Sequence, residues 1–151
     1  DNSVFRFRRG PDARSIKPLR IPGEECRDTS RLVAMAADIL DKDYDGRKVE
    51  RLFIDGTGVG GPLYDRLVQL GYEDRVQEVQ FGGASPNPKQ ANMRAYMWTK
   101  ARDWLQARGC IDDSAVFRQE LIQLHVDVVQ QFIELTRLEE KRSKSSYRQS
   151  H

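Results

Sequence analysis

The sequence is poor in the residues that form disulfide frameworks and zinc centres. Its two cysteines, Cys26 and Cys110, lie far apart and show no CxxC spacing, and its only histidines are His125 and His151. Two cysteines do not make a disulfide framework, so we interpret both as reduced thiols. The small supply of histidine and cysteine also argues against a zinc site.

A long apolar run and a strong net charge are missing as well. No stretch approaches the roughly 18 apolar residues that a membrane span needs, so we expect no membrane partner. Lys and Arg total 25 against 23 Asp and Glu, and a net charge of +2 argues neither for nor against nucleic acid. The length of 151 residues suits one domain. Because the sequence opens without methionine and closes on a polar, basic stretch, we expect a single domain, residues 1–151, cut from a longer protein.

The apolar periodicity predicts an α/β domain with a mixed central sheet flanked by helices. We expect the strands at 3–9, 50–55 and 76–81 to share one sheet, with the helices at 62–70 and 88–108 packed against it. Further elements are an edge strand at 15–21 and a C-terminal hairpin from the apolar runs at 126–129 and 132–135. The predicted N-caps are Thr29, Gly61, Asn87 and Asp113, and one face of the longest helix carries Met93, Met97, Ala101, Trp104 and Leu105.

Two familiar motifs fit poorly. DKDYDG, from Asp41 to Gly46, matches the first half of an EF-hand loop, but the twelfth position is Leu52 where a glutamate is needed. A polar turn is the better interpretation. GTGVGG, which begins at Gly56, contains the GxGxxG of dinucleotide-binding loops. The preceding Asp55 would set a negative charge beside the pyrophosphate, and the acid expected about 20 residues later is missing.

Asp55 ends the apolar run Leu52-Phe53-Ile54 and stands at the mouth of the glycine loop. One interpretation is an Asx-turn or cap that shapes the loop. The other is a metal ligand, because sites in α/β sheets collect beyond the carboxyl ends of strands and hard cations take carboxylate oxygens. Cleavage of a phosphodiester by two metals needs several such acids from different strands. Asp55 is therefore our candidate catalytic residue and metal ligand.

Three stretches in order, LFIDGTGVGGPLYDRL, VQFGGAS and NMRAYMWTKARDWLQARGCI, resemble the nuclease domain of the large terminase subunit of tailed bacteriophages. That family shows a strand ending in Asp-Gly-x-Gly-x-Gly, a helix, a strand ending in Phe-Gly, and a helix with Asn-x-Arg-Ala-x-x-Trp. In this sequence the last motif is Asn92, Arg94, Ala95 and Trp98. The similarity extends from Asp1 to the end of the chain.

The resemblance implies an RNase H-like fold and metal-dependent cleavage of double-stranded DNA during genome packaging, in the host cell cytoplasm. It implies a two-metal site for Mg²⁺ or Mn²⁺, with acids from a first strand, from the strand-end Asp and from a Ser-Pro-Asp segment. Asp55 matches the second of these, and the other two would lie before Asp1 and after His151. The implied partners are an ATPase domain in the same polypeptide, the portal and the small terminase subunit. The sequence itself has no Walker A motif.

A basic run near the C-terminus has two interpretations. It is a solvated tail, or it contacts DNA phosphates without reading sequence. Its members are Arg137, Lys141, Arg142, Lys144 and Arg148, and Lys89 and Arg94 are weaker DNA-binding candidates. The leading hypothesis is a terminase endonuclease domain. The alternatives are a non-catalytic RNase H-like DNA-binding or docking module and, third, a nucleotide-binding Rossmann-like domain.

Overall fold

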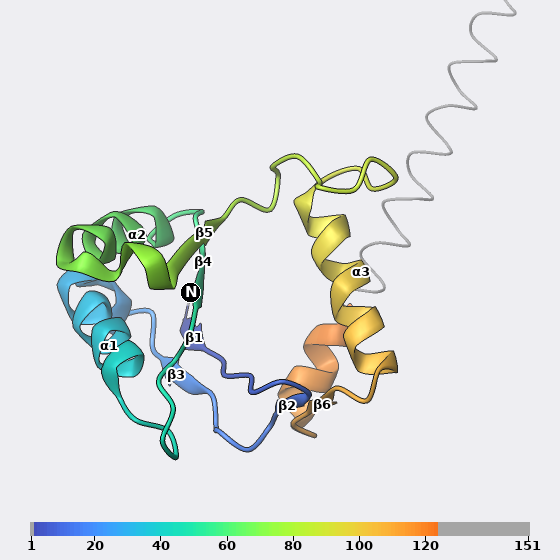
Figure 1. Ribbon diagram of the computed structural model, residues 1–151, viewed down its shortest axis with the longest axis horizontal. Helices are drawn as coiled ribbons and strands as arrows, with labels where there is room; N and C mark the ends of the chain where they lie inside the picture. The colour runs from blue at the N-terminus through green and yellow to red at the C-terminus, as the bar shows by residue number, and fades with distance from the viewer. Residues whose placement is uncertain (1, 124–151) are drawn as a thin grey trace, which may run out of the picture. The chain divides into compact units, whose positions relative to one another are not determined.

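The computed structural model describes residues 2–123, and the chain divides into two compact units, Asp1–Cys110 and Ile111–His151. In the second unit the described residues form a helix at 115–123. The strands and α-helices of the first unit, with β6 at its boundary, are coloured along the chain in Figure 1. In chain order they are β1 (Ser3–Phe5), β2 (Asp12–Ala13), β3 (Leu19–Ile21), α1 (Thr29–Asp41), β4 (Leu52–Asp55), α2 (Gly60–Leu67), β5 (Val76–Val79), α3 (Met93–Gln106) and β6 (Cys110–Ile111).

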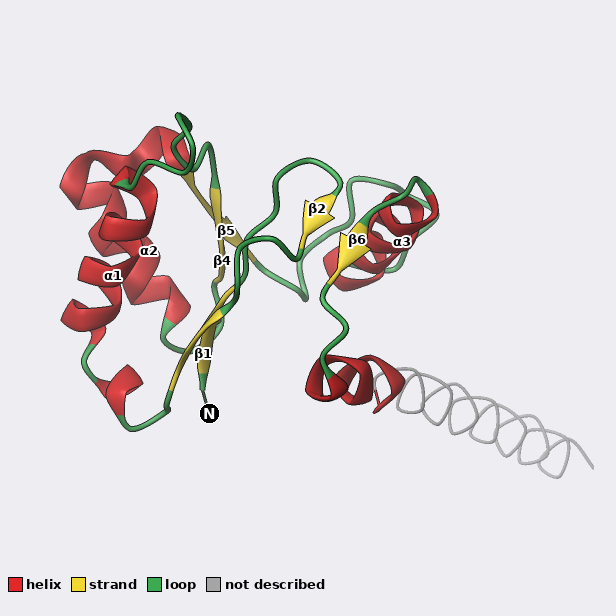
Figure 2. Cartoon of the chain, turned by 90° about the horizontal axis from the view of Figure 1, so that it is seen from below, coloured by secondary structure: helices red, strands yellow, loops and turns green. Residues whose placement is uncertain are grey.

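Helices α1 and α2 cover one face of β1, β4 and β5 and close the core (Figure 2). The completely buried side chains Leu32 and Leu40 come from α1, and Leu67 comes from α2. They pack with Ile54 of β4 and Val76 of β5, which are 5% and 4% exposed. Burial of apolar area on this scale stabilises the fold at roughly 25 cal/mol per Å². The predicted alternation of buried strands and amphipathic helices is confirmed for this part of the chain.

The strands form small sheets and not the single sheet that we expected. β1 pairs with β3 in antiparallel fashion, with Ser3 opposite Ile21, whereas β4 pairs with β5 in parallel, with Leu52 opposite Val76. β2 pairs with β6. The prediction that strands near 3–9 and 50–55 share a sheet is therefore wrong for the described residues. The structure is nevertheless a mixed α/β arrangement with parallel and antiparallel pairs, as the periodicity indicated.

The first two helices begin close to the predicted positions, but with different caps. The carboxylate of Asp28 accepts hydrogen bonds from the backbone of Ser30 and Arg31, so Asp28 is the N-cap of α1 in place of Thr29. Helix α2 begins at Gly60, one residue before the predicted cap, and has no side-chain cap. Gly71, which follows it, has a φ of +92°, a conformation that favours glycine.

Helix α3 begins later than predicted and buries none of its residues. Asn92 is its N-cap and accepts from the Ala95 N–H at 3.0 Å, while Asn87 closes a turn by accepting from the Lys89 N–H. Met97 and Leu105, members of the predicted packing face, are 37% and 41% exposed. The expected packing of this helix against the sheet is therefore not observed.

The helix at 115–123 also has a different cap from the one expected. Ser114 accepts from the Phe117 N–H, whereas the predicted cap Asp113 forms an ion pair with Arg118. The predicted hairpin at 126–129 and 132–135 lies outside the described residues.

The polar turn from Asp41 to Gly46, which matches half of an EF-hand loop in sequence, is held by hydrogen bonds within the turn and to neighbouring elements. Asp43 accepts from the Gly46 N–H at 2.6 Å, which closes the turn. Asp41 accepts from the Tyr72 hydroxyl at 2.6 Å and from Arg75. Arg75, just before β5, also donates to the backbone carbonyl of Val49 at 2.8 Å, so it ties the end of α1 to the segment before β4. Asp45, the third acid of the turn, forms an ion pair with Arg9, so protein contacts account for all three acids.

Candidate functional site

Asp55 lies at the carboxyl end of β4, and the residue is exposed. β4 runs parallel to β5 with Asp55 opposite Val79, and the Gly56 N–H extends the ladder by donating to the Val79 carbonyl at 2.9 Å. The carboxyl ends of both strands therefore lie at the same edge, where binding sites of α/β proteins collect. The predicted strand-end position of this acid is confirmed.

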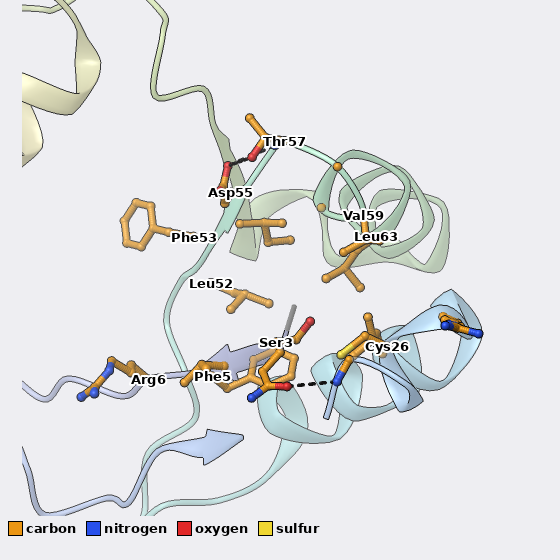
Figure 3. Close-up of a pocket in the computed structure, with 18 of the residues that line it drawn as sticks. Ser3, Phe5, Arg6, Cys26, Leu52, Phe53, Asp55, Thr57, Val59 and Leu63 are labelled. Atoms are coloured by element: carbon orange, nitrogen blue, oxygen red, sulfur yellow. Dashed lines mark hydrogen bonds between the residues drawn. The ribbon is translucent and has the colours of Figure 1, made fainter. Parts of the chain in front are cut away.

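The Asp55 carboxylate closes an Asx-turn. Its Oδ1 accepts from the Thr57 backbone N–H at 3.1 Å and from the Thr57 hydroxyl at 2.8 Å, and Figure 3 shows the two side chains side by side. Both of these hydrogen bonds go to Oδ1. The turn contacts therefore occupy one carboxylate oxygen, which is compatible with a second role for Oδ2.

The glycines after Asp55 bring helix α2 against the end of the strand. A Cβ on Gly60 would lie 1.6 Å from the Asp55 carbonyl oxygen, so no side chain fits there. Gly58 has a φ of +61°, which L side chains rarely adopt. At Gly61, the last glycine of the GxGxxG pattern, an added Cβ would make only ordinary contacts at 3.5 Å and 3.8 Å. Close packing thus accounts for Gly60, a residue that the motif does not single out.

A second carboxylate, Glu78 of β5, lies beside the glycine loop and was not selected from the sequence. A Cβ built on Gly56 would lie 2.4 Å from its Oε1, and one on Gly61 would lie 3.8 Å from the same atom. Glu78 is half-buried and lies opposite Ile54, one position before Asp55 in the strand register. Because side chains alternate between the faces of a sheet, it shares the face of Ile54 and not that of Asp55. The only sequence signal for the position of Glu78 was the alternation of side chains along the strand that begins at Val76.

A cleft of about 1060 Å³ opens beside Asp55. Its walls come from β1, β4 and the glycine loop, and its apolar lining includes Leu32 of α1 and Leu63 of α2. In Figure 3 the labelled side chains of Phe5 and Leu52 lie between β1 and β4. The volume lies just above the range of about 300–1,000 Å³ that is usual for ligand sites.

The described residues do not contain a complete metal site. They include no group of three or more histidine, cysteine, aspartate or glutamate side chains that could hold an ion. Asp55 fits as one oxygen ligand, because it is exposed at a strand end and keeps Oδ2 outside the turn.

The two later segments of the resemblance meet in the structure. The backbone N–H of Arg94 donates to the Phe81 carbonyl at 3.0 Å, and its guanidinium lies over the Phe81 ring at 5.7 Å from the centroid. The Met93 N–H donates to the Gly83 carbonyl at 2.8 Å. Arg94 therefore holds the loop after β5 against the start of α3, which gives it a structural role. The other weak candidate, Lys89, is exposed.

The predicted basic run, which consists of Arg137, Lys141, Arg142, Lys144 and Arg148, lies outside the described residues. Comparisons with protein-family models, curated proteins and solved structures gave no match. Among the helices of the described part of the chain, none has the length and apolar character that crossing a membrane requires.

Proposed function

We propose that this chain is the endonuclease domain of a phage terminase large subunit, with an RNase H-like fold, and that it cleaves double-stranded DNA with Mg²⁺ or Mn²⁺. The observation that carries the proposal is the exposed carboxylate of Asp55 at the carboxyl end of a parallel strand pair, at the mouth of a cleft. The ordered sequence motifs of the resemblance add to it. The host cell cytoplasm and the packaging partners follow from the resemblance alone.

In this proposal Asp55 would hold a divalent cation, while its Oδ1 keeps the turn with Thr57. A bound metal pair would activate water and stabilise the leaving oxygen of the phosphodiester. Gly60 lets the start of α2 reach the strand end, so the ligand is held on two packed elements. The resemblance assigns the remaining acidic ligands to segments that flank this sequence, before Asp1 and after His151, so this chain alone should bind metal weakly and cut poorly.

The test is Asp55→Asn in a protein that carries the natural flanking segments. Asparagine keeps an oxygen acceptor for Thr57 but removes the charge, so we expect metal-dependent nicking of plasmid DNA to be abolished. The melting temperature without metal should stay equal or rise, because a carboxylate in a ligand cluster repels its neighbours until metal arrives. The matched control is Thr57→Val, which removes one turn hydrogen bond and keeps the charge.

The two substitutions separate the roles of Asp55. Thr57→Val should nick DNA at the parental rate and lose stability by about 1 kcal/mol, the usual net value of one hydrogen bond. Parental nicking by Asp55→Asn would make Asp55 a turn residue only and would remove the anchor of the nuclease proposal.

A non-catalytic DNA-binding or docking module is the second candidate. It is the alternative because Asp55 is the one clear match in this sequence to the acidic cluster that the resemblance implies. DNA binding by the protein with its flanking segments, together with absent nicking at any Mn²⁺ concentration, would support the module over the nuclease.

A further inference from the structure

Glu78 of β5 covers the backbone that leads out of the strand carrying Asp55. A Cβ on Gly56, the next residue, would lie 2.4 Å from Oε1 and 2.7 Å from Cγ of Glu78. The same Cβ would lie 2.3 Å from Nε2 of Gln80. Glu78 lies opposite Ile54 in the parallel register, and strand alternation places residues 56 and 80 on the same, helix-facing side. The Cα of Gly56 therefore lies beneath two side chains of β5.

Gly56 is the link in the Asp55 turn that most needs such a cover. It stands between the Asp55 carboxylate and the Thr57 N–H, which donates to Oδ1 at 3.1 Å. Its own N–H is fixed by the hydrogen bond to the Val79 carbonyl at 2.9 Å. Glycine has the widest conformational freedom of all residues and no side chain to pack, so the rest of its backbone must be restricted by its neighbours. The geometry of the turn therefore depends on what lies on Gly56.

The Glu78 side chain also reaches the first turn of α2. A Cβ on Gly61 would lie 3.8 Å from its Oε1. Helix α2 has no side-chain N-cap and no acidic residue in its first turn. A carboxylate near the N-terminus of a helix is stabilised by the helix dipole and by N–H groups that have no partner within the helix. This attraction turns the Glu78 side chain towards the glycine loop and keeps it over Gly56.

Gln80 is a weaker cover than Glu78. It is exposed, and the atom that lies closest to the Cβ position of Gly56 is Nε2, the far end of a flexible side chain. Such an end can move away at little cost. Glu78 is half-buried and approaches the same position with Cγ, a carbon of its stem, as well as with Oε1. Glu78 is therefore the residue that restricts Gly56.

We propose that Glu78 is a positioning residue for Asp55. It packs on Gly56 and against the first turn of α2, and it thereby holds the turn in which the Thr57 N–H fixes Oδ1 of Asp55. Loss of this contact frees the turn and misplaces the carboxylate. The orientation of Asp55 does not depend on any reaction, whereas the consequence for metal binding rests on the proposed nuclease function.

The first experiment measures amide hydrogen exchange of the whole chain by NMR. Glu78→Ala should make the Thr57 amide exchange about tenfold faster, and by a larger factor than the amide of the buried Ala36, which reports global unfolding. Glu78→Gln keeps the length of the side chain, so exchange should stay within about twofold of the parent. The matched control is Glu73→Ala, which removes an exposed carboxylate outside the loop and should leave the Thr57 amide unchanged.

The second experiment locates the contact by thermal unfolding of a double-mutant cycle. Gly56→Ala places a methyl group where the Glu78 side chain lies, so the melting temperature should fall. In the Glu78→Ala background the same methyl group has room, so the fall should be smaller there. Substitutions of residues in contact have non-additive effects, whereas those of distant residues add.

The third experiment measures the Mn²⁺ dependence of plasmid nicking in the protein with its natural flanking segments. Residues that orient a metal ligand change metal affinity or activity by about 10–100-fold when they are replaced. Glu78→Ala should therefore raise the Mn²⁺ concentration for half-maximal nicking by about tenfold or more, with a smaller change in the rate at saturating Mn²⁺. Glu78→Gln should lie between this variant and the parent. A residue with only a structural role would lower the melting temperature and leave the half-maximal concentration unchanged.

Three results would overturn the proposal. They are equal exchange of the Thr57 amide in the parent and in Glu78→Ala, additive melting-temperature shifts in the cycle, and an unchanged half-maximal Mn²⁺ concentration in a protein that nicks DNA. A parent protein that shows no metal-dependent nicking would instead remove the nuclease proposal. The exchange and melting experiments would still test Glu78 in that case, so the two proposals fail separately.

Discussion

Replacement of Gly60 by alanine is the most direct test of the packing that positions Asp55. The added Cβ would lie 1.6 Å from the Asp55 carbonyl oxygen and 3.3 Å from Cγ2 of Ile54. The nearest atom belongs to the backbone, so no change of rotamer relieves the overlap, and α2 must move away from β4. Overpacking of a core costs about 1–3 kcal/mol, and we place this variant at the upper end.

The size of the effect follows from the length of the chain. For proteins of about 150–250 residues, 1 kcal/mol shifts the melting temperature by about 2–4 °C. Gly60→Ala should therefore melt about 6–12 °C below the parent in thermal unfolding followed by far-UV circular dichroism.

The neighbouring glycine gives the matched control. A Cβ on Gly61 makes only ordinary contacts at 3.5 Å and 3.8 Å. Alanine gains about 0.5–1 kcal/mol over glycine within a helix, and this gain is opposed by crowding from Pro62, which disfavours helical geometry in the residue before it. We expect a melting temperature within about 2 °C of the parent. Equal melting of the two alanine variants would refute the close approach of α2 to the end of β4.

Three further predictions concern the ends of the helices and the basic run. Tyr72→Phe should destabilise most between about pH 4 and pH 10 in urea unfolding. The hydrogen bond from the Tyr72 hydroxyl lowers the pKa of the Asp41 carboxyl, with help from Arg75, so the stabilisation by this bond is lost as the pH falls through the lowered pKa. The same bond, with desolvation, raises the pKa of Tyr72, so the stabilisation is also lost as the pH rises through the raised pKa. A stability difference that is constant with pH would contradict this. Asn92→Ala should lower the free energy of unfolding by about 1 kcal/mol, because it removes the N-cap of α3, and Asn87→Ala should lower it by less. A larger loss for Asn87→Ala than for Asn92→Ala would contradict the observed cap. Joint neutralisation of residues 141, 142 and 144 should weaken DNA binding equally for all sequences. The slope of log K against log salt concentration should fall in magnitude by about 0.9 for each lost phosphate contact. An unchanged slope would leave only the interpretation as a solvated tail.

The sequence predicted the positions of helices and strands better than it predicted which strands pair with each other. The apolar run that stops at Asp55 placed this acid at a strand end, and the stripe of α1 placed Leu32 and Leu40 in the core, because local periodicity carries both signals. Sheet membership depends on contacts between distant segments, so the separation of β1 from β4 could not be read from either strand.

The choice between similar residues also required the fold. Asn92 and Asn87 both have capping chemistry, and the pattern Asn-Pro favoured the wrong one because the turn at 87–90 has its own hydrogen bonds. Among the glycines, Gly60 was not separable from Gly61, since only the position of the Asp55 carbonyl distinguishes them. The position of Glu78 beside the loop likewise depends on the register of β4 with β5.

The remaining argument concerns why residue 55 is charged. An Asx-turn needs an oxygen acceptor for the Thr57 donors, and asparagine supplies one as well as aspartate does. The packing of Gly60 against the strand end involves the backbone carbonyl and is indifferent to the side chain. Turn and packing thus leave the negative charge without a structural purpose, while a charge at the mouth of a cleft attracts cations and repels phosphate. Asp55→Asn removes the charge and keeps the acceptor oxygen. It is therefore the substitution that distinguishes a metal ligand from a turn residue.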